Sequence, residues 1–336
     1  MNLLGAVPVW VLLVGAWAQG LPSVSHLPCD SPEAEAAALV AQDYLNAQHT
    51  HGYKYALNQI EEIKIITTPG GGEAYLMDLE LLETTCHVLD PTPVANCTVR
   101  SKYLTSVEAD CDVVLSNVGG VLSVTSFKCK TEESTEDICL GCPMLLLLND
   151  TAGLALVSAS LASFNNKTGN ESLFVLEEVG RMTSKVVSPK LLYQAEYIIT
   201  ETNCTIENNN SCVPLPTPQR GFCQAQGGSF GNTVDCMIFV RKTVNGTNDT
   251  VPAPPPGVHV HKGNLLVKPG LRHHKLTSFH DPDSSGILSA ESHEVVPVFP
   301  NVTDVPATTN ALNATDSLAV QPTLLVPLCP GKVIHF

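Results

Sequence analysis

The chain has 336 residues, of which 44% are hydrophobic, and a formal net charge of −15 at pH 7. Most of this charge lies in residues 19–139, which contain 18 acidic and 6 basic side chains. Because nucleic acid and anionic membranes need a basic surface, we exclude both as partners. Cations or a cationic surface are the natural partners of this region, and a role in solubility alone is the alternative.

Residues 1–18 are predicted to be a secretory signal peptide. An apolar run from Val7 to Trp17 ends in Ala16-Trp17-Ala18, an A-x-A cleavage pattern. A membrane anchor is the alternative, but the run is short for a bilayer, and no later segment is apolar for the required length of about 20 residues. The mature chain is therefore expected to begin near Gln19 and to be a secreted, extracellular plasma protein without a membrane span.

Two units follow, each with a helix before its strands. In the first unit, Ser31 is a candidate helix N-cap and Pro32 occupies the first helical position. Strand-like segments at 57–66 and 74–85 come next, with Gly70-Gly71-Gly72 in the turn between them. The helix face predicted to be buried consists of Ala36, Leu39, Val40, Asp43, Tyr44 and Ala47.

In the second unit, Thr151 is a candidate N-cap, and strand-like segments lie at 171–178 and 191–202. The predicted apolar helix face consists of Leu154, Val157, Leu161 and Phe164. Each unit is thus predicted to be an α+β domain with one helix on an antiparallel sheet. A unit of about 110 residues is large enough to bury its own core.

Residues 251–336 differ in composition from the rest of the chain. They begin near Pro254-Pro255-Pro256 and are rich in Pro, Ser, Thr, Val and His without a clear period, so the tail is predicted to be largely disordered. Its histidines are spaced for weak Zn²⁺ or Cu²⁺ binding at most, and no discrete metal site is expected. They are His259, His261, His273, His274, His280, His293 and His335.

Twelve cysteines, an even number, indicate an oxidising compartment. Eight of them form two similarly spaced quartets, Cys86, Cys97, Cys111 and Cys129, then Cys204, Cys212, Cys223 and Cys236. The repetition suggests a duplicated domain with two bridges in each copy. The simplest pairing of the remaining four is Cys139–Cys142 and Cys29–Cys329, although spacing alone leaves the connectivity open.

Two kinds of modification are predicted. Asn-x-Ser/Thr sequons indicate a glycoprotein and occur at Asn96, Asn149, Asn166, Asn170, Asn203, Asn209, Asn245, Asn248, Asn301 and Asn313. Serines that precede an acidic residue by two positions fit the acceptor pattern of secretory-pathway kinases. They are Ser134, Ser289 and Ser292, and phosphate would add negative charge at each.

Several stretches together carry a family resemblance. They are residues 75–95, 52–54 with 57–60, and 148–151, with Cys142-Pro143 and Cys329-Pro330-Gly331. These stretches resemble the fetuin family of the cystatin superfamily, most closely its fetuin-A branch. The resemblance implies two tandem cystatin-like domains, at 19–139 and 140–250, before the tail. It also implies the bridges Cys29–Cys329, Cys86–Cys97, Cys111–Cys129, Cys139–Cys142, Cys204–Cys212 and Cys223–Cys236.

The first domain carries candidate calcium ligands. Acidic residues two positions apart on a strand share one face of a sheet, and carboxylate oxygens are the ligands that Ca²⁺ prefers. The residues are Asp78, Glu80, Glu108, Asp110 and Asp112. The resemblance implies that this acidic sheet binds nascent calcium phosphate, although the family's third acidic position on the first strand is Leu76 here.

Protease inhibition is the competing function. Cystatins inhibit papain-like enzymes through a Q-x-V-x-G hairpin, which corresponds here to Thr68-Pro69-Gly70-Gly71-Gly72 and Val186-Val187-Ser188-Pro189-Lys190; only Gly72 matches. The fetuin-B branch inhibits zinc metalloproteases with an acidic residue in its interdomain bridge. The corresponding stretch, Cys139-Leu140-Gly141-Cys142-Pro143, keeps both cysteines but lacks the carboxylate.

The sequence therefore predicts a secreted glycoprotein, not an enzyme, that binds calcium phosphate and inhibits mineral precipitation. It has no cofactor other than calcium within the mineral and is expected to be a monomer. The alternative is an endopeptidase inhibitor, with metalloproteases favoured over cysteine proteases. Proteases and growth factors are further candidate partners.

Overall fold

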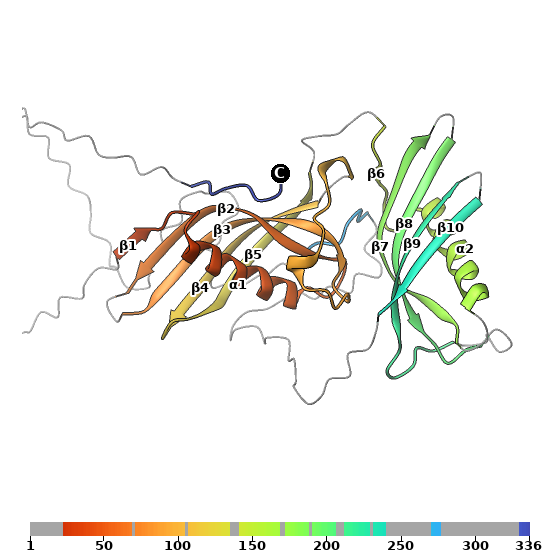
Figure 1. Ribbon diagram of the computed structural model, residues 1–336, viewed down its shortest axis with the longest axis horizontal. Coiled ribbons are helices and arrows are strands. Elements are labelled where there is room, and N and C mark those ends of the chain that lie inside the picture. Colours follow the sequence, from red (N-terminus) through yellow and green to blue (C-terminus); the bar gives the residue numbers. More distant parts are fainter. Residues whose placement is uncertain are drawn as a thin grey trace, which may run out of the picture.

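The computed structural model contains two five-stranded antiparallel sheets, each with one helix packed on one face (Figure 1). The strand orders are β1-β2-β3-β4-β5 in the first domain and β10-β9-β8-β7-β6 in the second. The predicted α+β class with two tandem domains is confirmed. The structure describes residues 23–68, 71–104, 107–134, 141–168, 172–187, 190–205, 212–228, 231–239, 270–276 and 329–336.

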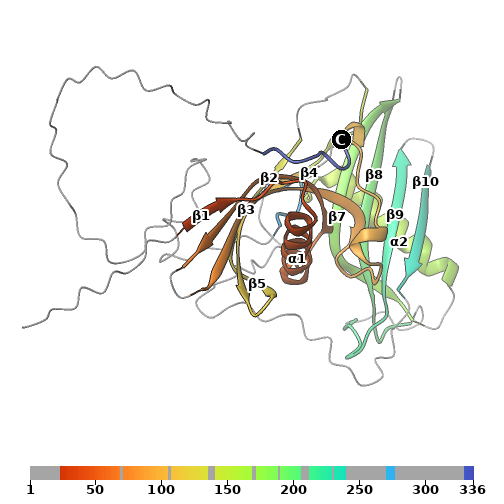
Figure 2. The same cartoon turned by 60° about the vertical axis from the view of Figure 1, so that its left-hand side comes forward.

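The first domain consists of β1 (Ser23–His26), α1 (Pro32–Gln48), β2 (Tyr53–Thr67), β3 (Glu73–His87), the short helices η1 (Val94–Asn96) and η2 (Lys102–Leu104), β4 (Val107–Val118) and β5 (Val121–Glu133). The second consists of β6 (Met144–Leu145), α2 (Thr151–Thr168), β7 (Phe174–Val187), β8 (Lys190–Glu201), β9 (Arg220–Gly228) and β10 (Gly231–Ile238). Helix α1 lies across the inside of its curved sheet (Figure 2), and α2 lies on the side of its sheet away from the first domain (Figure 1). None of the helices in the described ranges is long and apolar enough to cross a membrane.

Helix α1 begins as predicted, but its buried face differs from the prediction. Ser31 Oγ accepts a hydrogen bond from Ala34 N at 3.2 Å, and Pro32 is the first helical residue. Leu39 and Val40, predicted to be buried, are 42% and 37% exposed. The residues against the sheet are Ala34, Ala37, Ala38, Ala41 and Leu45. Alanines allow the helix to lie close to the sheet in a densely packed core, so Leu39 and Val40 lie on the outer side.

Helix α2 has the predicted apolar face but a different cap. Asp150 Oδ1 accepts a hydrogen bond from Gly153 N at 2.8 Å, which makes Asp150 the N-cap. Thr151, the predicted cap, is instead the first helical residue. The predicted face packs into the second core and consists of Leu154, Val157, Leu161 and Phe164.

Disulfide bonds join neighbouring strands and the chain ends. The structure contains Cys29–Cys329, Cys86–Cys97, Cys111–Cys129, Cys204–Cys212 and Cys223–Cys236. Cys142 is also disulfide-bonded, whereas Cys139 lies outside the described residues. Cys111 is directly opposite Cys129 across β4 and β5, and Cys223 is opposite Cys236 across β9 and β10. The repeated spacing in the sequence thus corresponds to a repeated cross-strand bond.

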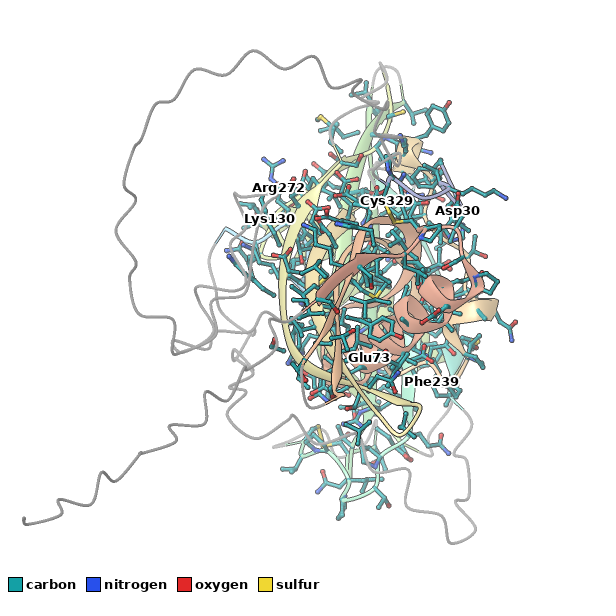
Figure 3. The ribbon with its side chains drawn as sticks, turned by 90° about the vertical axis from the view of Figure 1, so that its left-hand side faces the viewer. Asp30, Glu73, Lys130, Phe239, Arg272 and Cys329 are labelled. Carbon is teal, nitrogen blue, oxygen red and sulfur yellow. A yellow bond between two sulfur atoms is a disulfide. The ribbon has the colours of Figure 1, made fainter. Side chains whose placement is uncertain are left out.

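The last residues of the chain return to the first domain. The Cys29–Cys329 bond spans a sequence separation of 300 residues, and Figure 3 shows Cys329 close to Asp30. Gly331 N donates to Ile60 O at 2.8 Å, and Lys332 N donates to Asp30 Oδ1 at 2.6 Å. The C-terminal residues therefore lie against β2 and the start of α1.

A second stretch of the tail, residues 270–276, lies between the two domains (Figure 1), and we call it the interdomain strap. Leu148 N donates to Leu271 O at 2.8 Å in the second domain. Leu276 is 1% exposed in the core of the first domain, and its backbone N donates to Thr131 Oγ1 at 3.1 Å. The predicted disorder of the tail therefore does not apply to the strap.

Candidate functional site

The five candidate calcium ligands lie together on the face of the first sheet opposite α1. Asp78 and Glu80 on β3 are directly opposite Asp112 and Asp110 on β4, and Glu108 extends the β4 row. The residues that alternate with them point into the core on the helix side. We call these five half-buried side chains the acidic face.

Lysines on β5 lie beside the acidic face, which the sequence pattern did not reveal. The strand register places Lys128 opposite Asp112 and Lys130 opposite Asp110. Lys130 Nζ also lies 2.8 Å from Glu132 Oε2. A cation at this face must therefore compete with two ammonium groups for the carboxylates.

Burial and charge act in opposite directions on Asp110. Burial, followed by the nearby carboxylate of Glu132, raises the pKa of Asp110 above its ordinary value, while Lys130 partly offsets this effect. A bound cation would lower the same pKa because it favours the charged carboxylate. Protons and cations therefore compete for Asp110 as pH falls.

The acidic face has defined edges. Leu76 on β3 lies opposite Val114 on β4, so an apolar pair occupies the position at which the sequence resemblance implied a third acidic residue. Near Glu80, Asn58 Nδ2 donates to Glu80 Oε2 at 3.0 Å and to the Phe336 backbone oxygen at 3.2 Å. The last residue of the chain therefore borders the acidic face.

The geometry of the acidic face is better suited to contacting several cations on one surface than to chelating a single ion. Within the described parts of the chain, no three His, Cys, Asp or Glu side chains are grouped so that they could hold one metal ion. Neighbouring strands are about 4.8 Å apart, so carboxylates on adjacent strands form rows at that spacing. Such rows can contact several cations of a cluster at once.

The hairpin that corresponds to the cystatin inhibitory loop is present but lacks its side chains. Thr68, Gly71 and Gly72 lie in the connection between β2 and β3, and Thr68 N donates to Gly72 O at 2.8 Å. Pro69 and Gly70 lie outside the described residues. The connection therefore offers no side chain of the Gln or Val type among its described positions.

The second hairpin and the interdomain bridge lie at one end of the second domain. Val186 and Val187 end β7 and are 64% and 53% exposed, and Lys190 begins β8. Gly141, in the bridge, is exposed with a φ of 86°. Ser188, Pro189, Cys139 and Leu140 lie outside the described residues. This end of the second domain thus combines an exposed apolar hairpin between β7 and β8 with an interdomain bridge that has no acidic side chain at Gly141.

The modification sites differ in accessibility. Exposed sequon asparagines among the described residues are Asn96, Asn149, Asn166 and Asn203. Ser134 is buried at the end of β5 with 9% exposure, which limits access by a kinase in the folded state. The other predicted sites lie outside the described residues and are Asn170, Asn209, Asn245, Asn248, Asn301, Asn313, Ser289 and Ser292.

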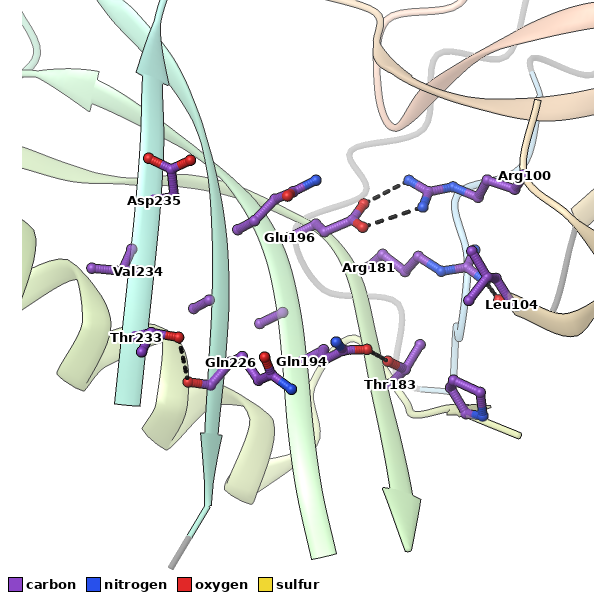
Figure 4. Close-up of a pocket in the computed structure, with 14 residues that line it drawn as sticks. Arg100, Leu104, Arg181, Thr183, Gln194, Glu196, Gln226, Thr233, Val234 and Asp235 are labelled. Carbon is purple, nitrogen blue, oxygen red and sulfur yellow. Dashed lines mark hydrogen bonds and ion pairs between the residues drawn. The ribbon is translucent and has the colours of Figure 1, made fainter. Parts of the chain in front are cut away.

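A buried ion-pair network joins the domains, and sequence reasoning missed it. Glu83 Oε2 of β3 lies 2.9 Å from Arg100 Nε and 2.8 Å from Arg181 Nη1 of β7. Arg100 also pairs with Glu196 of β8 at 2.6 Å and lies 4.4 Å from the centre of the Tyr53 ring. Positively and negatively charged side chains thus alternate across the interface, and Figure 4 shows the pair of Arg100 and Glu196. The sequence signal that could have indicated this network is Glu83, a charged residue inside the apolar run that ends at Cys86.

The pKa values of the network show how strongly its charges are coupled. Burial raises the pKa of Glu196, but the positive charge of Arg100 outweighs this effect and holds the pKa below its ordinary value. Burial also disfavours the charged form of Arg100, while Glu196 and Glu83 outweigh it and raise the pKa of Arg100. Both groups therefore stay ionised in the buried interface.

The network borders a pocket of about 420 Å³ between the domains. Its floor is the outer face of the second sheet, where Gln194 on β8 is opposite Gln226 on β9. Leu104 of the first domain forms part of its wall, and its backbone oxygen accepts a hydrogen bond from Arg181 Nη2 at 2.6 Å. The pocket (Figure 4) therefore depends on the two domains lying together.

Comparisons with known proteins agree with the fold and with the resemblance in the sequence. Residues 141–229 match the family model described as cystatin domain. The chain is 36% identical to alpha-2-HS-glycoprotein of Pan troglodytes over 352 residues, covering 95% of this chain and 94% of the relative. The crystal structure of mouse fetuin-B has a TM-score of 0.57 at 24% identity, covering 69% of this chain and 74% of that chain. Mouse fetuin-B in complex with crayfish astacin has a TM-score of 0.55 at 25% identity, covering 66% and 70%.

The similarity to alpha-2-HS-glycoprotein spans nearly the whole chain, and the cystatin match falls on the second of two similar domains. The repeated helix-and-sheet unit with its repeated cross-strand disulfide is consistent with both. The chain belongs to the fetuin family of cystatin-like proteins, which includes alpha-2-HS-glycoprotein, or fetuin-A.

Proposed function

We propose that the protein is a secreted, non-enzymatic glycoprotein that binds calcium phosphate clusters through the acidic face and delays their precipitation. The observation that carries this proposal is the register of β3 and β4, which brings Asp78 and Glu80 next to Asp112 and Asp110. Each carboxylate contact with Ca²⁺ is weak, but many contacts to one cluster add through multivalency. Calcium is therefore a part of the mineral ligand and not a resident cofactor.

Neutralising the acidic face tests the proposal. A variant with Asn or Gln at all five positions is expected to lose the precipitation delay and to match a protein-free solution. The measurement is turbidity of a supersaturated calcium phosphate solution over time, with circular dichroism to check the fold. Like charges opposite one another on neighbouring strands repel, so neutralising these half-buried carboxylates should leave the fold intact. An undiminished delay by the folded variant would remove the acidic face from the proposal.

A matched control separates local geometry from net charge. Glu35 and Asp43 on α1 and Asp235 on β10 are exposed and lie away from the acidic face. Neutralising these three should leave the delay unchanged, whereas neutralising Asp78, Asp112 and Asp110 should shorten it. Equal shortening by both triple variants would attribute the activity to overall charge.

Removing the lysines beside the face gives a prediction of opposite sign. Lys128 and Lys130 lie opposite two of the proposed ligands, so replacing both with glutamine should lengthen the delay. The change removes competing positive charge and leaves each carboxylate in place. A dose–response curve of protein concentration against delay would detect the gain, and an unchanged or weaker response contradicts cation binding at this face.

Inhibition of a zinc metalloprotease is the second candidate function. The structural similarity to mouse fetuin-B in complex with crayfish astacin favours it, as does the exposed apolar end of the second domain with Val186, Val187 and Met144. The absence of a carboxylate at Gly141 argues against the same mode of zinc contact, because glycine has no side-chain ligand. Titration of an astacin-type protease, with serine in place of Val186 and Val187 as the control variant, distinguishes the two functions.

Papain-like proteases are expected not to be inhibited. The connection from Thr68 to Gly72 has neither the Gln nor the Val that a wedge into the protease cleft requires. The check is a titration of papain against the intact protein. Nanomolar inhibition would contradict the expectation, and its persistence after replacement of Gly71 would place the activity on another surface.

A further inference from the structure

Two rows of side chains cross the outer face of the second sheet, on the side away from α2. In each row, the strand register aligns one residue from each of β7, β8, β9 and β10. The first row is uncharged and consists of Thr183, Gln194, Gln226 and Thr233. The second row is mostly charged and consists of Arg181, Glu196, Gln224 and Asp235. Both rows line the pocket of about 420 Å³ between the domains (Figure 4), which we call the interdomain pocket.

The glutamines supply both donors and acceptors to the pocket. Gln194 Oε1 accepts a hydrogen bond from Thr183 Oγ1 at 3.5 Å. The side-chain amides of Gln224 and Gln226 have no hydrogen bond to another residue in the parts of the chain that the structure describes. A carboxamide has two N–H donors and an oxygen with two acceptor positions. Because neighbouring strands are about 4.8 Å apart, these amides present donors and acceptors at a regular spacing.

The backbone of the pocket floor is already hydrogen-bonded within the sheet. Strand β8 pairs with β7 and β9, and β9 pairs with β8 and β10. A peptide that binds as an added strand needs a free sheet edge, whereas the floor of this pocket is the face of two inner strands. A ligand on the floor must therefore bind through side chains.

The charged groups around the pocket disfavour a charged ligand. Arg100 Nη2 lies 2.6 Å from Glu196 Oε2, and Arg181 Nη1 lies 2.8 Å from Glu83 Oε2. An anion would compete with these carboxylates for the guanidinium groups and would also meet Asp235 at the exposed rim. A cation would meet the two guanidinium groups, and separating a buried ion pair is costly. The pocket therefore favours an uncharged ligand that forms hydrogen bonds.

The pocket also has a small apolar part and a limited size. Leu104 of the first domain and Pro143 of the second line it together with the polar rows. Its volume of about 420 Å³ lies in the lower part of the range of about 300–1,000 Å³ that is typical of small-molecule sites. One or two sugar rings match this size, and their hydroxyl groups match the amides. An N-acetylated sugar also has a methyl group that can pack against Leu104 and Pro143.

We propose that the interdomain pocket binds an N-acetylated hexosamine unit of a saccharide. Gln194, Gln224 and Gln226 form hydrogen bonds with its hydroxyl and acetamido groups, and Leu104 and Pro143 cover the acetyl methyl. Because Leu104 belongs to the first domain and the glutamines belong to the second, the sugar contacts both domains. The site lies on the second sheet and is independent of mineral binding at the acidic face of the first.

Titration with N,N′-diacetylchitobiose, followed by nuclear magnetic resonance of the glutamine side-chain amides, tests the proposal. The NH₂ resonances of Gln194, Gln224 and Gln226 should shift and reach saturation. Replacing Gln194 and Gln226 together with methionine keeps the side-chain length and removes the amides, so binding should weaken by about tenfold or more. Gln219→Met is the matched control, because Gln219 is exposed and lies outside the pocket, and it should bind as the parent protein does.

Maltose is the comparison probe, because it has hydroxyl groups but no acetamido group. It should bind more weakly than diacetylchitobiose by about threefold or more. Equal binding of the two disaccharides would overturn the assignment of an N-acetylated sugar.

The sugar can come from another molecule or from the chain's own predicted N-linked glycans, and enzymatic removal of those glycans distinguishes the two sources. If glycan removal alone shifts the three glutamine resonances, the occupant is a glycan of this chain; if only added diacetylchitobiose shifts them, it comes from outside. Both results support the site. Circular dichroism checks the fold, and Gln224→Met, at an exposed position, replaces the double variant if that one fails to fold. Unchanged binding by the folded variant, or no saturable shift before and after glycan removal, would overturn the proposal.

Discussion

Replacing Glu83 with glutamine is expected to destabilise the folded protein by about 3–5 kcal/mol and to loosen the contact between its domains. Glu83 is 2% exposed and lies between Arg100 and Arg181. Without its charge, two guanidinium groups remain buried beside one carboxylate of the described network, that of Glu196. Removing one member of a buried ion pair costs more than the pair contributes, because the remaining charge loses its partner without regaining water. Urea unfolding measures the stability change, and small-angle X-ray scattering measures the expansion.

A surface ion pair provides the matched control for this prediction. Arg220 Nε lies 2.8 Å from Glu177 Oε2, and the two side chains are 43% and 30% exposed. Glu177→Gln should therefore change stability by about 1 kcal/mol or less. Replacing Glu83 and Arg181 together with methionine should recover part of the loss, since the remaining pair of Arg100 and Glu196 is balanced. A loss in Glu83→Gln no larger than that in Glu177→Gln would show that the network does not hold the domains together.

The fold and the composition of the acidic face could be predicted because both depend on local patterns. Alternating carboxylates at Glu108, Asp110 and Asp112 indicate one face of a strand whichever neighbour the strand has. The lysines at 128 and 130 were not placed beside them, because that position depends on the register between β4 and β5. Register is set by the turn and the core pattern of both strands together.

The domain junction could not be predicted, for a different physical reason. Its members lie far apart in the sequence, as with His51 and Glu178 or Glu83 and Arg181, and their spacing carries no periodic signal. Gly52, with a φ of 72°, allows a close approach, because an added Cβ would lie 2.6 Å from His274 Cβ. A single glycine before a strand does not reveal which distant segment approaches it. Contacts between the domains can therefore be identified only from a structure that contains both domains.

The interdomain strap gives the second large expected effect. Leu276→Ala should destabilise the protein by about 2–5 kcal/mol, because it removes a side chain that is 1% exposed in the core of the first domain. Leu39→Ala on the outer side of α1 is the control, since Leu39 is 42% exposed and should change stability by about 0.5 kcal/mol or less. Urea unfolding gives both values on one scale.

The same pair of variants distinguishes a packed strap from a loosely attached one. A strap that is integral to the core transfers the loss at Leu276 to the global unfolding of the first domain, so its transition midpoint falls. A strap that only touches the surface would open locally, and Leu276→Ala would then match Leu39→Ala in global stability while hydrogen exchange in residues 270–276 increased. The first outcome is expected, because Leu276 N also donates to Thr131 Oγ1 inside the domain and because His274 occupies the junction beside Gly52.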